Sequence, residues 1–277
     1  MLTRRRHVRW PFVALILAAI AFVTPMFWVV LSSLKAESEI GAVPLRVLPA
    51  APTSENYQLA VTLIDFGRYL QHSLELAVIY TIPTVITSAL VGYAFARWSA
   101  PGSRLMFGLV IGTLLVPLFV FVVPLFVIYS KVGMLNTYWP WFLWGVAGNP
   151  FLIFLCRQFF LSIPRELEEA AEIDGAGRFG TIWRIVMPIS RGLLATCAIL
   201  AFTSVWGEVL VQSLFLNLDS TTTLSVRLAS GYRDATGHAP LVGPLLAGVV
   251  VYTIPVLAIF LIAQRQIVQG TATTGFK

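Results

Sequence analysis

Residues 105–130 read LMFGLVIGTLLVPLFVFVVPLFVIYS, and none of their side chains is charged. A helix of about 20 apolar residues is long enough to cross the hydrocarbon core of a bilayer, which is about 30 Å thick. Buried helices of soluble proteins have shorter apolar runs, of about 10–14 residues. This stretch therefore predicts a transmembrane helix.

The composition of the whole chain fits a membrane protein. Of its 277 residues, 57% are apolar and 12% are charged, whereas a soluble domain has about 25% charged residues. The chain is too apolar for a disordered protein, and its two cysteines, Cys156 and Cys197, are too few for a disulfide scaffold. The net charge of +6 could indicate nucleic acid, but in so apolar a chain basic residues mark cytoplasmic loops, so we expect no nucleic-acid partner.

Five further apolar stretches resemble the first in length, so the sequence predicts an all-α integral membrane protein with six transmembrane helices. We expect one transmembrane domain over residues 1–277, in contact with lipid. The predicted spans are residues 10–34, 74–96, 105–130, 136–157, 192–214 and 240–264. Most of the 19 Lys and Arg residues fall in segments on the side of the amino terminus. This excess predicts that both termini are cytoplasmic.

The most polar part of the chain is residues 161–191, between the fourth and fifth predicted spans. Good helix formers over 165–173 predict a short helix, which Gly175 would end in a left-handed cap. A second amphipathic segment, 179–185, is expected to stop at Pro188. The pair could rest on the membrane surface, or its small residues could let another protein approach. The many acids suit an anionic membrane surface poorly.

The spacing within this loop resembles the EAA loop of ABC importer permeases, E-A-A-x3-G-x9-I-x-L-P. The matching residues are Glu169-Ala170-Ala171, Gly175, Ile185 and Met187-Pro188, and Asp174-Gly175-Ala176 matches the common D-G-A. Met187 replaces the usual leucine at similar volume. The resemblance implies that Glu169, Ala170, Ala171, Asp174, Gly175, Ala176, Ile185 and Pro188 form a cytoplasmic coupling loop that contacts an ATPase subunit.

Other segments are similar to carbohydrate-importer permeases, and most of all to the MalG-like group, the smaller permeases of maltose-type systems. These segments are Asn56-Tyr57, residues 93–97, 133–137, 206–208 and the tail, 264–277. Two residues depart from the family, His72 and Gly207, where asparagine is common. The second departure weakens any transfer of substrate by analogy.

The resemblance also implies the partners of the chain. These are a second homologous permease, two ATP-binding subunits and an extracytoplasmic substrate-binding protein, in a bacterial or archaeal cytoplasmic membrane. The chain has no G-x-x-x-x-G-K-[S/T] phosphate loop, so ATP and Mg would bind the partner ATPase subunits. We expect no enzyme activity, catalytic residue, metal or cofactor in this chain. Gly270, Gly275 and Lys277 of the tail would contact the ATPase pair.

Two acids fall in predicted spans: Glu75 lies at the outer end of the second, and Glu208 lies deeper, in the fifth. At 1.5 Å per residue Glu208 lies about 25 Å along the helix from Arg191, and a charge deep in lipid costs about 2.5–3.5 kcal/mol. We therefore expect Glu208, with Trp206 and Gly207, to face a gate or a substrate cavity. A purely structural acid is the alternative.

Trp139, Trp141, Trp144 and Phe142 gather near the start of the fourth predicted span. They could stack on sugar rings, but an aromatic belt at the membrane interface explains them as well and is the interpretation we favour. They do not identify a substrate.

The resemblance implies uptake of a sugar of the disaccharide or oligosaccharide class. The alternatives are the same architecture for a glycerol phosphodiester or polyol, an ion-coupled secondary transporter, and a purely structural membrane protein. The secondary transporter would require inverted repeats and paired broken helices, which the sequence does not indicate. A structural protein would leave the EAA pattern unexplained.

Overall fold

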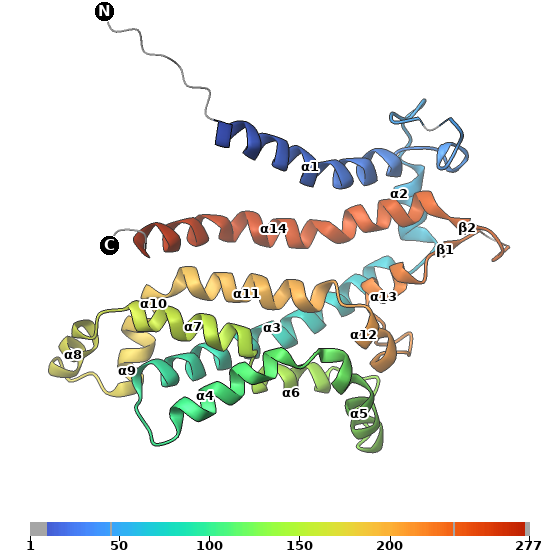
Figure 1. The fold of residues 1–277 in the computed structure, drawn as a ribbon. Helices are drawn as coiled ribbons and strands as arrows, with labels where there is room; N and C mark the ends of the chain where they lie inside the picture. Colours follow the sequence, from blue (N-terminus) through green and yellow to red (C-terminus); the bar gives the residue numbers. More distant parts are fainter. Residues whose placement is uncertain (1–9, 45, 235, 275–277) are drawn as a thin grey trace, which may run out of the picture. The chain divides into compact units, whose positions relative to one another are not determined.

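The computed structural model describes residues 10–44, 46–234 and 236–274, and of residues 11, 263 and 265–274 it describes only the backbone. The chain is helical almost throughout (Figure 1). In order, the elements are α1 (Trp10–Ser33), the 3₁₀ turn η1 (Glu37–Glu39), α2 (Glu55–Thr62), α3 (Phe66–Arg97), α4 (Ser103–Gly112), the 3₁₀ turn η2 (Thr113–Leu115), α5 (Leu118–Lys131), α6 (Trp139–Ala147), α7 (Pro150–Ser162), α8 (Glu166–Ile173), α9 (Arg178–Thr181), the π-helical turn η3 (Ile182–Val186), α10 (Met187–Ile189), α11 (Arg191–Trp206), α12 (Leu210–Phe215), α13 (Leu224–Ala229), β1 (Tyr232–Arg233), β2 (Pro240–Leu241) and α14 (Val242–Thr274).

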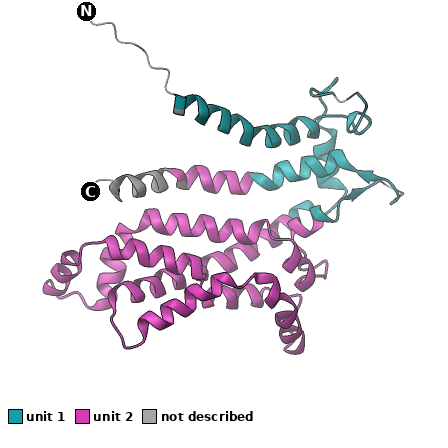
Figure 2. Ribbon diagram, in the orientation of Figure 1, with its two compact units in different colours: residues 1–67, 228–253 teal, residues 68–227, 254–277 magenta. Residues whose placement is uncertain are grey.

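The chain divides into two compact units (Figure 2). Unit 1 comprises residues 1–67 and 228–253, and unit 2 comprises residues 68–227 and 254–277. Unit 1 holds α1, α2, α13 in part, the short antiparallel pair β1–β2 and the first part of α14. Unit 2 holds the helices from α3 to α12, among them those of the predicted coupling loop and of the Glu208 region.

Long apolar helices confirm the all-α membrane class. Among the described residues, four helices are long and apolar enough to cross a bilayer: Phe12–Ser33, Phe66–Arg97, Trp139–Ser162 and Val242–Ile262. Two bent pairs pass the same test together: Ser103–Leu115 with Leu118–Lys131, bent by 95°, and Arg178–Ile189 with Arg191–Trp206, bent by 79°. The number of spans is six if each bent pair is one span.

The predicted third span, 105–130, is not one straight helix. It breaks between α4–η2 and α5 at Val116, whose backbone is extended at φ −89° and ψ 117°. Val116 precedes Pro117, and a proline disfavours the helical conformation of the residue before it. The apolar run therefore identified the membrane segment correctly as helical but missed the bend that its proline imposes.

The core of unit 2 is built on close approach between α3 and α7. A Cβ atom at Gly92 would lie 2.6 Å from Cys156 Cβ and 2.9 Å from the Ile153 carbonyl oxygen. Real Cβ atoms do not approach so closely, so only glycine allows α3 to pack at this distance. Cys156 is fully buried and its Sγ lies 3.7 Å from that of Cys197 on α11. The two cysteines are thus core residues of three adjoining helices.

Unit 1 is held by polar side chains at helix ends. The buried amide of Asn56 donates to the carbonyl oxygens of Ser33 and Lys35, at 2.8 and 2.7 Å, beyond the end of α1. Glu37 accepts hydrogen bonds from the backbone N–H groups of Val242 and Gly243, at 2.7 and 2.8 Å, at the start of α14. These bonds satisfy backbone groups that a helix leaves unpaired at its ends. Asn56, singled out by resemblance, therefore has a structural role.

Candidate functional site

The loop between α7 and α11 forms a helical hairpin at one end of unit 2. Its first helix is α8, Glu166–Ile173, which ends at Asp174. Gly175 follows with φ +82°, a conformation that favours glycine. The second arm runs through α9, η3 and α10 to Ile189. We expected the second segment to stop at Pro188, and this was wrong: the arm continues through Pro188 to Ile189, directly after the π-helical turn.

The residues of the EAA pattern differ in exposure. Glu169, Ala170, Asp174 and Gly175 are exposed, Ala176, Ile185 and Pro188 are partly buried, and Ala171 is buried. Large apolar side chains also project from the hairpin: Leu167 is 43% exposed, Ile173 86%, Phe179 77% and Trp183 54%. Exposed acids and exposed apolar groups therefore share one surface.

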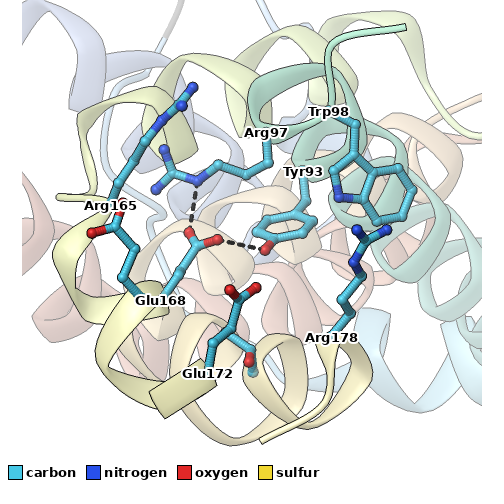
Figure 3. A pocket seen from close by; sticks show the side chains of 9 residues that line it. Tyr93, Arg97, Trp98, Arg165, Glu168, Glu172 and Arg178 are labelled. Carbon is cyan, nitrogen blue, oxygen red and sulfur yellow. Dashed lines mark hydrogen bonds and ion pairs between the residues drawn. The ribbon is translucent and has the colours of Figure 1, made fainter.

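A carboxylate triad ties α8 to α3, and we call it the buried triad (Tyr93, Arg97 and Glu168). Arg97 Nε donates to Glu168 Oε1 at 2.6 Å, and the Tyr93 hydroxyl donates to Glu168 Oε2 at 2.7 Å (Figure 3). Arg97 also donates to the carbonyl oxygen of Ile163, at 2.8 Å, just after α7. The side chains of Arg97 and Glu168 are only 7% and 16% exposed.

Sequence reasoning missed Glu168, although one signal was present. Tyr93 and Arg97 are four residues apart and therefore lie on one face of a helix. Two donors on one face near a helix end call for an acceptor from a neighbouring element. The triad borders a hollow of about 190 Å³ lined by Tyr93, Arg97, Trp98, Arg165, Glu168, Glu169, Glu172, Arg178 and Thr181.

A second triad of the same composition lies near the other end of α3, and we call it the exposed triad (Arg68, Tyr69 and Asp219). Arg68 contacts Asp219 at 3.3 Å, and the Tyr69 hydroxyl donates to the other carboxylate oxygen. Here the side chains of Arg68 and Asp219 are 43% and 70% exposed. The ion pair is thus exposed to water at one end of α3 and largely buried at the other, while the tyrosine is buried in both triads.

Glu208 lies at a break between α11 and α12, so the predicted span 192–214 is not continuous. Its two carboxylate oxygens accept from the backbone N–H groups of Val211, at 2.7 Å, and Gln212, at 2.9 Å. The carboxylate therefore caps the start of α12, where a negative charge is favoured. The Gln212 side chain, itself buried, donates to the Val205 carbonyl oxygen and accepts from Thr223 and Ser225. This network fixes the geometry of the break.

Glu208 also lines a cavity of about 430 Å³ in unit 2. The cavity walls include the aromatic rings of Tyr80, Trp141, Trp144 and Phe215, and the polar side chains of Thr113, Asn149 and Ser204. Trp206 and Gly207 do not line it: Trp206 is buried and stacks on Phe202 at 4.9 Å, and Gly207 is exposed. Trp141 is only 3% exposed, so it does not belong to an interfacial belt, whereas Trp139 is 56% exposed.

The remaining predicted residues lie at the carboxyl terminus. Gly270 is in the last part of α14, while Gly275 and Lys277 lie outside the described residues. Among the residues that the structure does describe, no group of three or more His, Cys, Asp or Glu side chains could hold a metal ion.

Comparison with known proteins assigns the class of this fold and site. Residues 88–272 match the family model described as binding-protein-dependent transport system inner membrane component. The chain belongs to this family, and it is a permease subunit of a membrane transport system.

Relatives across nearly the full length are sugar-transport permeases. The chain is 32% identical to the diacetylchitobiose uptake system permease protein NgcG of Streptomyces coelicolor, over 99% of this chain and 90% of that protein. It is 30% identical to the trehalose transport system permease protein SugB of Mycobacterium tuberculosis, over 99% and 98%. It is 31% identical to the trehalose/maltose transport system permease protein MalG of Thermococcus litoralis, over 95% and 94%.

A solved structure shares the fold. A chain of a bacterial ABC transporter involved in the import of the acidic polysaccharide alginate superposes with a TM-score of 0.78, at 21% identity, over 92% of this chain and 94% of that one. The family match and the sugar-transport relatives confirm the resemblance to carbohydrate ABC permeases noted from the sequence.

Proposed function

We propose that this chain is the membrane subunit of an ATP-driven, binding-protein-dependent importer for a disaccharide or oligosaccharide. In this proposal α8 docks on an ATPase subunit, and closure of the ATPase pair on ATP switches the permease between inward-facing and outward-facing states. The partners are a second homologous permease, two ATP-binding subunits that carry ATP and Mg, and an extracytoplasmic binding protein. Both termini lie in the cytoplasm, and the tail that contains Gly270, Gly275 and Lys277 lies against the ATPase pair.

The observation that carries the proposal is the mixed surface of the α8 hairpin. A helix that rests on a membrane separates its apolar face from its polar face. Here exposed Ile173 and Phe179 accompany exposed Glu169 and Asp174, and acids are repelled by anionic lipid. Apolar anchors bordered by charges are typical of a protein–protein contact.

Docking is tested by two substitutions at the hairpin. Glu169→Arg reverses an exposed charge and should greatly reduce co-purification of the ATPase subunits with this chain. Gly175→Leu adds bulk at φ +82°, while Gly175→Ala imposes the same backbone strain without the bulk. Apart from its two chain neighbours, no described residue has an atom within 4 Å of an added Cβ there. If Gly175→Leu loses co-purification and Gly175→Ala keeps it, the added bulk therefore reports contact with a partner. Unchanged co-purification in both Glu169→Arg and Gly175→Leu contradicts the proposal.

The sugar substrate is supported by the cavity around Glu208. Aromatic rings offer flat apolar faces, and the Glu208 carboxylate accepts hydrogen bonds from hydroxyl groups. A glycerol phosphodiester carries a negative charge, which the carboxylate would repel. A neutral polyol stays as the alternative substrate. Membership in a binding-protein-dependent family speaks against an ion-coupled secondary transporter.

Glu208→Gln separates three roles for this acid. If the carboxylate contacts sugar, transport falls and the preference among sugars changes. If it holds a gate, ATP hydrolysis without substrate rises. If it only caps α12, transport, sugar preference and ATP hydrolysis without substrate stay at the level of the parent chain. The thermal stability of the complex then falls, because an amide oxygen is a weaker acceptor than a carboxylate.

A further inference from the structure

We propose that Glu168 is a positioning residue that makes α8 move as one body with α3 and α7, so that displacement of α8 reaches the cavity around Glu208. The inference rests on the proposed function and deepens it. It names the contact through which an ATPase on α8 would act on the membrane part of unit 2.

The α8 helix has little apolar anchoring of its own. Of its eight residues only Ala171 is buried. Pro164 precedes the helix, and Gly175 and Gly177 follow it. An element with so little buried apolar surface opens readily from the body of a protein. The position of α8 therefore depends on the polar contacts of its side chains.

Glu168 supplies those contacts with a fixed geometry. Both of its carboxylate oxygens are engaged, one by Arg97 and one by Tyr93, which lie one turn apart on α3. The carboxylate therefore cannot rotate without breaking a hydrogen bond. Arg97 simultaneously holds the Ile163 carbonyl oxygen after α7. One guanidinium thus joins α3, the end of α7 and α8.

Stability alone does not account for this arrangement. A buried ion pair adds little net stability compared with apolar side chains of the same volume, because both ions lose their hydration. What such a pair does provide is a single geometry, because a buried charge is strongly unfavourable in any arrangement that separates it from its partner. A rigid link is what a helix needs if it is to transmit a displacement.

The two helices joined to α8 also form walls of the cavity. Tyr80 on α3 and Pro150, the first residue of α7, both line it, together with Glu208. The close approach of α3 and α7 at Gly92 lets them move together. A displacement of α8 that Glu168 transmits to these helices therefore changes the cavity.

The test measures how the cavity responds to ATP, so it needs no identified sugar. Ser204 lines the cavity and is exposed, and both native cysteines are fully buried. A Ser204→Cys chain is purified with its natural partners, and the rate of labelling by a polar maleimide is measured with and without Mg, ATP and vanadate. The chain without this cysteine gives the background.

In the parent complex we expect the labelling rate to change with ATP. Glu168→Gln and Arg97→Lys should assemble with the ATPase and hydrolyse ATP, but the change in labelling should shrink by about fivefold or more, the scale of a typical coupling between sites. Two matched variants should keep the response of the parent. Glu166→Gln removes an exposed charge from the same helix, and Asp219→Asn alters the exposed triad.

An unchanged response in both Glu168→Gln and Arg97→Lys overturns the inference, whatever the yield of complex. If neither assembles, Tyr93→Phe decides, because it removes one hydrogen bond to Glu168 and keeps the ring: its response must be reduced, and an unchanged one overturns the inference. If the parent complex contains no ATPase or shows no ATP-dependent change, the proposed function itself fails, and the inference falls with it.

Discussion

The two triads of α3 show how one set of groups acts differently in two surroundings. Each consists of a tyrosine, an arginine and a carboxylate, and each joins α3 to a segment distant in sequence. In the exposed triad water competes for the ion pair between Arg68 and Asp219, so the pair contributes about 0–1 kcal/mol. In the buried triad the ion pair between Arg97 and Glu168 is mostly shielded from water, so the loss of one member is costly even though the net stability gained from the pair is small. Burial, and not composition, is therefore what makes the buried triad hold α8 and α3 in a fixed arrangement.

The largest difference should come from removing the carboxylates. Glu168→Ala leaves Arg97 buried without its counter-ion and should lower the free energy of unfolding by about 3–5 kcal/mol. Asp219→Ala should lower it by less than about 1 kcal/mol. Denaturant titration of the detergent-solubilised chain measures both, and equal effects would show that the two triads do not differ as their exposure indicates.

The next effect concerns glycines near the two ends of α3. Gly92→Ala places a Cβ 2.6 Å from Cys156 Cβ and should destabilise the chain by about 1–3 kcal/mol through overpacking. At Gly67 an added Cβ would have no atom within 4 Å from any described residue outside the nearby helix backbone and its chain neighbours, so Gly67→Ala should stabilise the helix by up to about 1 kcal/mol. The same denaturant titration measures the change in the free energy of unfolding for both variants. If Gly67→Ala destabilises the chain as much as Gly92→Ala, the packing difference between the two positions is refuted.

Removing the tyrosine hydroxyls should have a smaller effect. Tyr93→Phe leaves one oxygen of a largely buried carboxylate without a donor and should cost about 1–2 kcal/mol. Tyr69→Phe should cost less, because Asp219 is 70% exposed and water can replace the lost donor. Double-mutant cycles that pair each tyrosine with its carboxylate give the coupling energies of Tyr93–Glu168 and Tyr69–Asp219. A larger coupling energy for Tyr69–Asp219 would contradict the expected difference between the two triads.

The smallest effect is on salt dependence. Between about 0.05 and 0.5 M salt the Debye length falls several-fold, which screens exposed charges far more than buried ones. The cost of Asp219→Asn should therefore fall by a few tenths of a kcal/mol, while that of Glu168→Gln stays constant. Stability curves of the two variants at both salt concentrations are sufficient, and a salt-sensitive Glu168 would mean that water reaches the buried triad.

Apolar run length was enough to predict the membrane class and most helices, because the cost of unpaired backbone in lipid leaves few other structures. Breaks inside the runs were not predicted. The bend at Pro117 had a local signal in the proline, whereas the break at Glu208 depends on the Gln212 network with Thr223 and Ser225. Contacts between side chains 11 and 13 residues apart, across a loop, have no periodicity that a sequence could display.

In the candidate site the sequence predicted the helix and its glycine cap, but not which side chains are buried. The good helix formers over 165–173 located α8, and the left-handed conformation of Gly175 followed from glycine chemistry. Which acid of α8 is buried could not be inferred, because four glutamates crowd the helix and only the position of α3 selects Glu168. Trp141 was misinterpreted for the same reason, since its burial depends on neighbours from other helices.

The helix-end contacts of unit 1 join segments that are synthesised at different times. Glu37 meets its backbone partner at Val242 across 205 residues of sequence. At about 5–20 residues per second, a ribosome needs roughly 10–40 s to make that length of chain. During this interval α1 is already synthesised, yet the Glu37 carboxylate has no helix start to accept from. A chain that stops short of α14 therefore lacks the backbone N–H groups that Glu37 binds, so this contact of unit 1 forms only after the start of α14 has been made.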